Sequence, residues 1–421
     1  MTKVTEVPKG YKKTKVGVIP EDWEVKRLNN LCKIVRGSSP RPAGDPQFFD
    51  GNYIPWLTVK SLTSISDSQI SVLKTATKLT EEGAKRSRVL QKGTLILSNS
   101  GATLGVPKIL GITCCANDGV AAFLDVKSAS AEVLYLYYYL TSKTKYFQEV
   151  VAPGNGQPNL NTELIGEIYL QLPRLKEQKK IASILSTWDE AIAKTQQTFD
   201  ALKERNDSLA MQLLSGKKRL EEFEGKWETV RMKDAFEEVR EVNDGGKHEP
   251  LTISAKLGFV SQKDKFDKVI AGSSLAKYTL IKAGDFCYNK GNSKTYPMGC
   301  IFKLEKFSSA LVPFVYISFR AKTSIESDFF KYWFSHHGLD RQLKAIITSG
   351  ARGDGLLNVN RADFFNLKLP KPPLEEQKAI AQVLQQADQE LQHYQNKLDT
   401  LREQKKGLMQ KLLKGEVRVQ V

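Results

Sequence analysis

Apolar positions recur with a helical period in two long stretches of the chain. Between residues 177 and 216 they step by four and three without a break, and residues 376–415 repeat the pattern. Such an a/d seam is typical of helices that pack along their length. The predicted seam residues are Ile181, Leu185, Trp188, Ile192, Phe199, Leu202, Leu209, Leu213, Ile380, Leu384, Leu391, Tyr394, Leu398, Leu401, Leu408 and Leu412. We therefore predict two coiled-coil helices, each about 60 Å long at about 1.5 Å per residue.

The two stretches are copies of each other. They align without a gap at a constant offset of 199 residues, and 15 of the 40 positions are identical. The repeat reaches further upstream, because Trp23-Glu24 resembles Trp227-Glu228 at a similar distance before each copy. The duplication predicts a chain that runs globular unit, helix, globular unit, helix.

The mode of helix packing leaves alternatives open. Asn206 and Lys405 occupy the same polar seam position, which either fixes the register at a cost in stability or lies near a helix end and reaches water. A two-copy chain closes most simply about a pseudo-two-fold axis, which makes the helices antiparallel. Apolar residues off the seam indicate either a further helical partner or contact with the globular units. These residues are Ile184, Met211, Leu214, Val383 and Leu413.

The globular units mix strand-like and helix-like segments. The strand-like runs are 94–97, 168–172, 311–319 and 365–369, and the helix-like runs are 131–141 and 327–336. We predict an α+β fold with two globular domains in a pseudo-two-fold arrangement, separated by two long antiparallel coiled-coil helices. The predicted boundaries are 1–173 for the first domain, 174–216 for the first helix, 217–371 for the second domain, 372–415 for the second helix and 416–421 for a C-terminal tail.

Composition narrows the class of protein. The chain has 421 residues, of which 41% are apolar and 26% charged, as in ordinary globular proteins with more than one domain. No window approaches 18 consecutive apolar residues, so no membrane-spanning helix is expected. Five cysteines without a Cys-x-x-Cys pair argue against a disulfide scaffold or a zinc site and favour a cytoplasmic location.

Charge indicates the kind of partner. Lys and Arg number 63 and Asp and Glu 47, which gives a net charge of +16. The two repeated helical segments carry net charges of −1 and +2, so the rest of the chain carries +15. A surplus of this size favours a polyanion, usually nucleic acid, and places it on the globular units.

Short polar loops in the globular units are the candidate DNA contacts. Glycine-containing loops of this kind bring backbone groups and polar side chains close to phosphates or base edges, although ordinary surface turns have the same composition. The candidate residues are Arg36, Ser38, Arg41, Lys60, Asn99, Ser100, Thr103, Gln157, Asn159, Lys290, Asn292, Ser293, Lys294 and Arg352.

Catalytic and metal-binding patterns are missing from the sequence. There is no Asn-Pro-Pro-aromatic motif of amino-methylating enzymes and no Gly-x-Gly-x-x-Gly after a strand. Residues 291–295 look faintly like a phosphate loop, but Ser293 stands where that pattern needs glycine. The adjacent His336 and His337 lack the i, i+4 spacing of a metal pair. We therefore expect neither a catalytic site nor a metal site.

Several short motifs, in their order and duplication, match a known family. They are 17–25 (GVIPEDWEV), the 37–40 turn with Ile54-Pro55-Trp56, 156–161 (GQPNLN), Leu172-Pro173 leading into 177–182 (EQKKIA), and 369–378 (LPKPPLEEQK). With these the chain resembles the specificity subunit of type I restriction–modification systems over essentially its whole length. The second unit departs from the pattern, because it lacks a clear Gly-x-Ser-Pro turn and Ile-Pro-Trp.

The resemblance implies a non-catalytic DNA reader in the cytoplasm. Two target-recognition domains would each read one half of an asymmetric split site in double-stranded DNA, with the long helices as a ruler between them. Two modification subunits, which bind S-adenosylmethionine and methylate adenine, and two restriction subunits, which use ATP and Mg²⁺, would dock on it, whereas this chain binds no cofactor. The alternatives are a target-recognition subunit of another DNA-modifying or defence complex, and an autonomous DNA-modifying enzyme.

Overall fold

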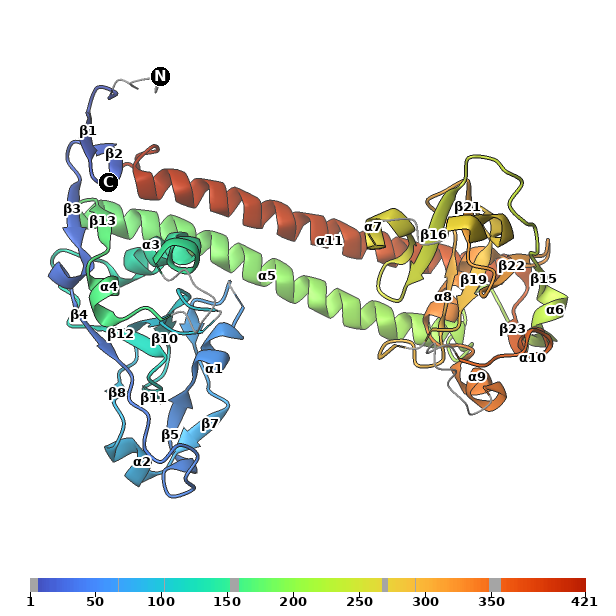
Figure 1. Ribbon diagram of the computed structural model, residues 1–421, viewed down its shortest axis with the longest axis horizontal. Helices are drawn as coiled ribbons and strands as arrows, with labels where there is room; N and C mark the ends of the chain where they lie inside the picture. The colour runs from blue at the N-terminus through green and yellow to red at the C-terminus, as the bar shows by residue number, and fades with distance from the viewer. Residues whose placement is uncertain are drawn as a thin grey trace. The chain divides into compact units, whose positions relative to one another are not determined.

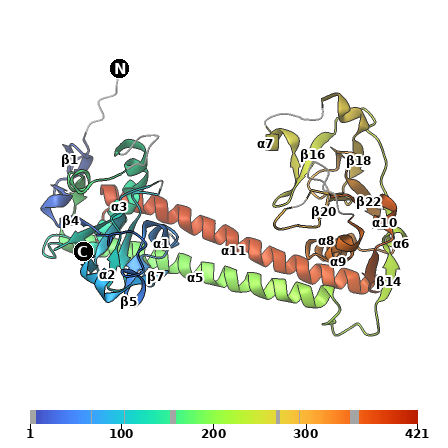
Figure 2. The ribbon, with the colours of Figure 1, turned by 60° about the horizontal axis from the view of Figure 1, so that its bottom comes forward.

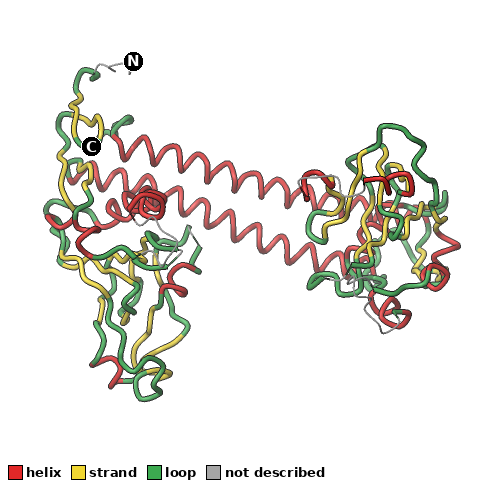
Figure 3. The backbone as a smooth tube through the Cα atoms, viewed as in Figure 1, coloured by secondary structure: helices red, strands yellow, loops and turns green. Residues whose placement is uncertain are grey.

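The computed structural model describes residues 7–66, 68–101, 103–151, 159–266, 272–291, 293–347 and 357–421. The chain forms two compact units, Met1–Thr198 with Tyr394–Val421, and Phe199–His393. The boundary between them falls inside the two long helices, so each unit contains one part of each helix. In the described residues, helix is concentrated in these two segments, whereas strands and loops make up most of the rest (Figure 3).

The two long helices lie side by side and antiparallel. They are α5 (Leu175–Leu214) and α11 (Leu374–Lys414). In the first unit Lys405 Nζ lies 2.5 Å from Asp189 Oδ1, and Arg402 Nη2 donates to Gln196 Oε1 at 3.0 Å. Residue numbers rise along one helix as they fall along the other, and Figures 1 and 2 show the pairing from two directions. The predicted packing of two long helices is confirmed.

The second unit pairs its halves of the helices in the same sense. Asn206 Nδ2 donates to the backbone oxygen of Ala387 at 3.0 Å, and Arg205 forms an ion pair of 2.6 Å with Glu390. Asn206 and Lys405, the two polar seam positions, are thus both bonded to the opposite helix. Neither is an end residue that reaches water, so the register-fixing alternative describes both.

Every predicted seam residue is buried or half-buried. Among the apolar residues off the seam, Leu214 and Leu413 lie in the hydrophobic cores of their own units. Met211 keeps 60% of its surface exposed. Contact with the globular units therefore covers part of the widened stripe, and Met211 remains open to a partner.

Among the described residues, no helix combines the length and apolarity needed to cross a membrane.

The first unit is built around two sheets that carry most of its described strands. Its elements are β1 (Tyr11–Thr14), β2 (Gly17–Pro20), β3 (Glu24–Arg27), η1 (Leu28–Asn30), β4 (Lys33–Arg36), β5 (Phe49–Leu57), α1 (Val59–Thr63), β6 (Ser71–Val72), β7 (Thr77–Leu79), α2 (Glu81–Lys85), β8 (Val89–Leu90), β9 (Leu95–Ser98), β10 (Pro107–Leu110), β11 (Cys114–Ala116), β12 (Val120–Leu124), α3 (Val133–Tyr146), the π-helical turn η2 (Phe147–Val151), α4 (Thr162–Gly166) and β13 (Tyr169–Leu172). The strand orders are β4-β12-β9-β10-β6 and β7-β5-β11-β8, with β1-β2 and β13-β3 as separate pairs.

The second unit repeats this topology. Its elements are β14 (Glu228–Arg231), α6 (Met232–Ala235), β15 (Phe236–Glu238), β16 (Glu249–Ser254), β17 (Gly258–Ser261), α7 (Gln262–Phe266), η3 (Gly272–Lys277), β18 (Thr279–Lys282), β19 (Phe286–Asn289), β20 (Cys300–Lys303), β21 (Ser309–Val312), β22 (Ile317–Ala321), α8 (Ser327–Ser335), α9 (Asp340–Ile346), α10 (Arg361–Phe365) and β23 (Lys368–Lys371). The orders β15-β22-β19-β20 and β17-β16-β21-β18 match those of the first unit strand for strand, except that β6 has no partner there.

Two strand predictions in the second unit were wrong in detail. The run 311–319 is not one strand, because Pro313 begins a turn. This turn is closed by a 3.0 Å hydrogen bond from the Tyr316 N–H to the backbone oxygen of Pro313. Phe365 does not begin a strand but ends α10, whose first turn is capped by the Asn360 side chain. In both places a turn or cap interrupts an apolar run that looked continuous.

Each long helix begins beside a buried glutamate. Glu177, in the first turn of α5, is 2% exposed and accepts from Trp23 Nε1 at 3.0 Å and from Arg418 Nε at 2.8 Å. The Arg418 guanidinium also lies over the Trp23 ring and binds both Asp22 oxygens at 2.9 Å. A carboxylate in the first helical turn is also favoured by the helix dipole.

The start of α11 repeats the arrangement in the second unit. Glu376 is fully buried and accepts from Trp227 Nε1 at 3.0 Å and from Arg219 Nε at 2.5 Å. Arg219 and Arg418 are themselves 199 residues apart, so the whole Trp–Glu–Arg clamp is duplicated. Each clamp ties the first turn of one long helix to the segment that follows the end of the other.

Candidate nucleic-acid interface

The predicted DNA loops of the first unit converge on one end of its larger sheet. Arg36 Nε, at the end of β4, donates to the backbone oxygen of Asp118 at 2.8 Å. The Asn99 N–H, just after β9, donates to the backbone oxygen of Gly119 at 2.9 Å. The turn between β11 and β12 thus joins the loops that follow β4 and β9. We call residues 36–41, 99–101, 103–105, 117–119 and 159–160 the first loop cluster.

The segment before α4 completes this cluster. Leu160 donates its N–H to the Asn99 oxygen at 2.7 Å, and Asn159 forms a β-bridge with Ser100. The far side of the same loop is fixed by the Ser98 hydroxyl, which donates to the Thr103 oxygen at 2.8 Å. Segments 60 residues apart in sequence are therefore joined directly by hydrogen bonds, because the pairing of the strands brings their ends together.

The predicted residues of the cluster differ in exposure. Arg41 is 75% exposed and lies 3.6 Å from the Asp118 carboxylate, while Thr103 and Asn159 are also exposed. Lys60 is exposed on the adjoining helix α1, whose first turn is capped by the Thr58 side chain. These four side chains are available to a phosphate backbone. Ser38 and Arg36 are half-buried; Arg36 is bonded within the cluster, and the Ser38 N–H donates to the Ala116 oxygen just before it.

Asn99 is the exception, because it is completely buried. Among the described residues, neither its Nδ2 nor its Oδ1 has a hydrogen-bond partner, and Asn117 Oδ1 in the same cluster is also buried and unpaired. Leaving such a group unsatisfied costs about 1–3 kcal/mol. The 117–119 turn was missed by sequence reasoning, although its Asn-Asp-Gly sequence is a turn signal.

The second unit brings together the equivalent segments. Leu357 donates its N–H to the Lys290 oxygen at 2.9 Å, and Lys290 Nζ donates to the Val359 oxygen at 3.0 Å. This repeats the contact between Leu160 and Asn99 in the first unit. Lys294 is exposed in the same loop, whereas the Ser293 N–H is bonded to the Tyr296 oxygen at 3.0 Å. The candidates Gln157, Asn292 and Arg352 lie outside the described residues.

Arg361 organises this end of the second unit and was not predicted. Its Nη1 lies 2.5 Å from Glu238 Oε1, and its Nη2 donates to the Phe314 oxygen at 2.9 Å and the Tyr316 oxygen at 3.1 Å. One guanidinium at the start of α10 thus links the end of β15 to the turn before β22. No local sequence pattern marks such a residue, since its partners are more than 40 positions away.

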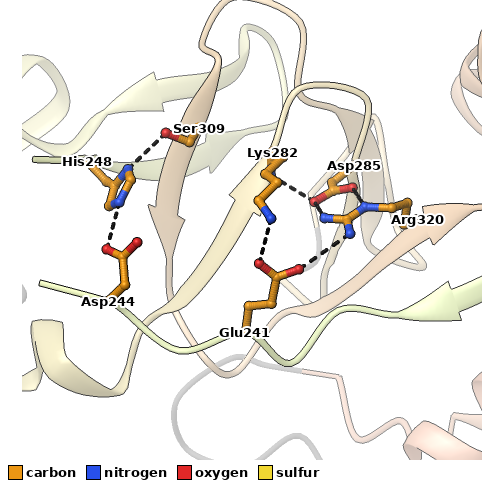
Figure 4. Close-up of polar contacts among 7 residues, drawn as sticks. All are labelled: Glu241, Asp244, His248, Lys282, Asp285, Ser309 and Arg320. Atoms are coloured by element: carbon orange, nitrogen blue, oxygen red, sulfur yellow. Dashed lines mark hydrogen bonds and ion pairs between the residues drawn. The ribbon is translucent and has the colours of Figure 1, made fainter. Parts of the chain in front are cut away.

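The structure also supplies the counterpart of the Gly-x-Ser-Pro turn that the second unit lacked. The connection from β15 to β16, residues 239–248, occupies the place of the connection from β4 to β5. Glu241 anchors this connection to the neighbouring strands, because its carboxylate lies 3.0 Å from Lys282 Nζ and 3.4 Å from Arg320 Nη1 (Figure 4). Arg320 in turn binds the buried Asp285, and these hydrogen bonds raise the pKa of the guanidinium.

In the same connection, the His248 ring contacts two polar side chains, those of Asp244 and of Ser309 in β21. His248 Nε2 lies 2.9 Å from Asp244 Oδ1, and His248 Nδ1 lies 2.8 Å from Ser309 Oγ (Figure 4). In serine hydrolases the carboxylate binds Nδ1 and the serine faces Nε2, which is the reverse. Ser309 also sits in a strand, paired with Lys282. The three side chains therefore tie the loop to β21. In the described part of the chain, no three His, Cys, Asp or Glu residues are grouped to hold a metal ion.

Comparisons with known proteins agree with this architecture. The family described as "Type I restriction modification DNA specificity domain" matches residues 20–204 and 254–402. Among curated relatives, the type I restriction enzyme MjaIX specificity subunit of Methanocaldococcus jannaschii is 25% identical over 97% of both chains. The MjaVIII specificity subunit of the same organism is 24% identical over 95% of this chain and 94% of its own length.

Solved structures share the fold. A type I restriction–modification S subunit from M. genitalium aligns with a TM-score of 0.55 and 14% identity, over 93% of this chain and 96% of that chain. A chain from a study of complex assembly and conformational transition of the type I R-M system gives a TM-score of 0.57 at 14% identity, over 95% and 99%.

Proposed function

The chain belongs to the type I restriction modification DNA specificity family, and from this premise we propose that its two units read the two halves of an asymmetric, bipartite DNA site. It is the DNA specificity subunit of a type I restriction–modification system, with two target-recognition domains, and is not itself a catalyst. The repeated sheet topology supports one half-site per domain, and the different loop sequences support different half-sites.

The partners follow from the same assignment. The subunit acts in a type I complex with DNA. In our proposal two modification subunits, which carry S-adenosylmethionine, and two restriction subunits, which use ATP and Mg²⁺, assemble on it, while this chain holds no cofactor. Met211, exposed on α5, is a candidate contact for a helix of a modification subunit. We place the complex in the cytoplasm, since all five cysteines are buried free thiols.

The observation that carries the proposal is the pair of antiparallel helices, continuous over 40 and 41 residues, each of which contributes one part to each unit. We propose that they set the distance between the half-sites. Seven residues added to a helix lengthen it by about 10 Å, which corresponds to about three base pairs of DNA.

The test is to insert one heptad into α5 and a matching heptad into α11, so that the seam stays paired. The variant is co-expressed with the modification subunit, and methylated adenines are mapped across the genome. We expect the same bases in both half-sites and a gap about three base pairs longer. An unchanged gap would exclude the spacer role. Replacing seven seam-compatible residues without changing helix length is the control. Absence of adenine methylation with the unaltered chain would contradict the proposed function itself.

A further inference from the structure

The first loop cluster contains buried side-chain amide atoms that the fold leaves unsatisfied. Asn99 is completely buried, and both polar atoms of its side chain are without a partner among the described residues. Asn117 Oδ1 is likewise buried and unpaired. The backbone of Asn99, by contrast, is fully bonded, through its N–H to Gly119 and its oxygen to Leu160. The fold therefore holds the residue in place without using its side chain.

An unused buried amide is a poor choice for stability. A leucine has nearly the same shape and buries no unpaired polar group, so it would stabilise the same position. Retaining asparagine at a stability cost is typical of functional sites, where local rules are broken for a purpose. The same reasoning does not apply to Asn161 and Asn360, because each accepts a backbone N–H as a helix cap.

Two polar groups of the cluster, Ser100 Oγ and Asn117 Oδ1, lie close to Gly119. A Cβ placed on Gly119 would lie 2.6 Å from Ser100 Oγ, 2.5 Å from Val59 Cγ2 and 3.5 Å from Asn117 Oδ1. Only glycine leaves room for these side chains to approach the turn. Ser100 and Asn117 thus flank the same turn to which Asn99 is bonded.

We propose that Asn99, supported by Asn117 and Ser100, is a base-reading residue that recognises an adenine in the half-site of the first domain. A side-chain amide offers a donor and an acceptor side by side, which matches the N7 and N6 positions of adenine in the major groove. No other base presents that pair of groups there. On DNA binding the Asn99 side-chain amide becomes exposed, and the adenine edge supplies the hydrogen-bond partners that the fold does not. The inference rests on the proposed function, since it requires that the first domain reads DNA.

The test uses the full-length chain with the isosteric substitution Asn99→Leu, co-expressed with the modification subunit. Adenine methylation is mapped across the genome, and the thermal unfolding of the purified chain is measured. We expect the preference for adenine at one position of one half-site to fall by about 5- to 150-fold, which corresponds to about 1–3 kcal/mol of discrimination. The melting temperature should be equal to or above that of the parent, because an unpaired amide has been removed.

Asn161→Leu is the matched control, because it changes the same residue type in the same unit but removes a used hydrogen bond of 2.7 Å to the Leu164 N–H. It should lower the melting temperature and leave the methylated sequence unchanged. If Asn99→Leu lowers the melting temperature and leaves the site intact, Asn99 is structural and the inference is wrong. If the parent chain directs no adenine methylation at a split site, the proposed function fails instead.

Discussion

The buried ion pair between the long helices allows a quantitative test of how their register is fixed. In the first unit the Asp189 side chain is 4% exposed and that of Lys405 is 14% exposed, with 2.5 Å between Oδ1 and Nζ. The Tyr138 hydroxyl donates to the other carboxylate oxygen at 2.8 Å. The substitution Lys405→Met leaves Asp189 buried with only this one donor.

The expected loss follows from desolvation. Removing one partner of a buried pair typically costs about 3–5 kcal/mol, because the remaining charge is uncompensated. Since Tyr138 still donates to Asp189, we expect the lower end, about 3 kcal/mol. The double variant Asp189→Leu with Lys405→Met removes both charges and should lose only about 1 kcal/mol, for the Tyr138 hydroxyl that loses its acceptor.

The assay is equilibrium unfolding in urea, followed by circular dichroism at 222 nm. Asn206→Leu, at the equivalent position in the second unit, is the control. It removes the hydrogen bond to Ala387 and the acceptor for two contacts from Arg205, and it should cost about 1–2 kcal/mol. A loss below 1 kcal/mol for Lys405→Met would refute the reasoning. So would a double variant as unstable as the single one, because the penalty would then not come from the isolated carboxylate.

Two further predictions concern the end of α11 and the tail beyond it. Hydrogen bonds from Arg418 lower the pKa of Asp22 below its ordinary value of 3.8, so the pair contributes stability at higher pH that is lost as the pH falls through the folded-state pKa. The free energy of unfolding in urea is measured for the parent and for Asp22→Asn from pH 7 to pH 2.5. The difference between the two should stay constant above about pH 5 and shrink below pH 3.8. A difference that does not change with pH would contradict this prediction. Gly415→Ala should cost about 1–3 kcal/mol in thermal unfolding, because φ is +72° and the new Cβ would lie 2.6 Å from Pro20 Cδ. Gly407→Ala, whose new Cβ would lie in open space on α11, should instead stabilise the protein. Equal changes in melting temperature for the two variants would contradict this prediction.

The long helices could be predicted from the sequence, because their periodicity is local and repeated. Residues 181 and 185, or 380 and 384, need only their neighbours to reveal a helix face. The polar seam positions were also visible, but their partners were not. That Lys405 binds Asp189, whereas Asn206 binds a backbone oxygen, depends on the register of two segments that are 216 and 181 residues apart at these contacts.

The loop cluster shows the opposite case. The sequence identified Arg36, Asn99 and Asn159 as candidates one loop at a time, but it could not bring them together, because strand order and pairing are non-local. It also could not distinguish the exposed Asn159 from the buried Asn99, which have the same residue type in similar loops. Arg361 was missed for the same reason, since its function depends on chain segments that only the fold makes adjacent.

The duplicated Trp–Glu–Arg clamp has a consequence for how the protein is handled in the laboratory. In each unit the arginine lies shortly after the end of a long helix, Arg219 after Leu214 and Arg418 after Lys414. A truncation or a tag placed between Lys414 and Arg418 would separate this cation from the buried Glu177 that it neutralises.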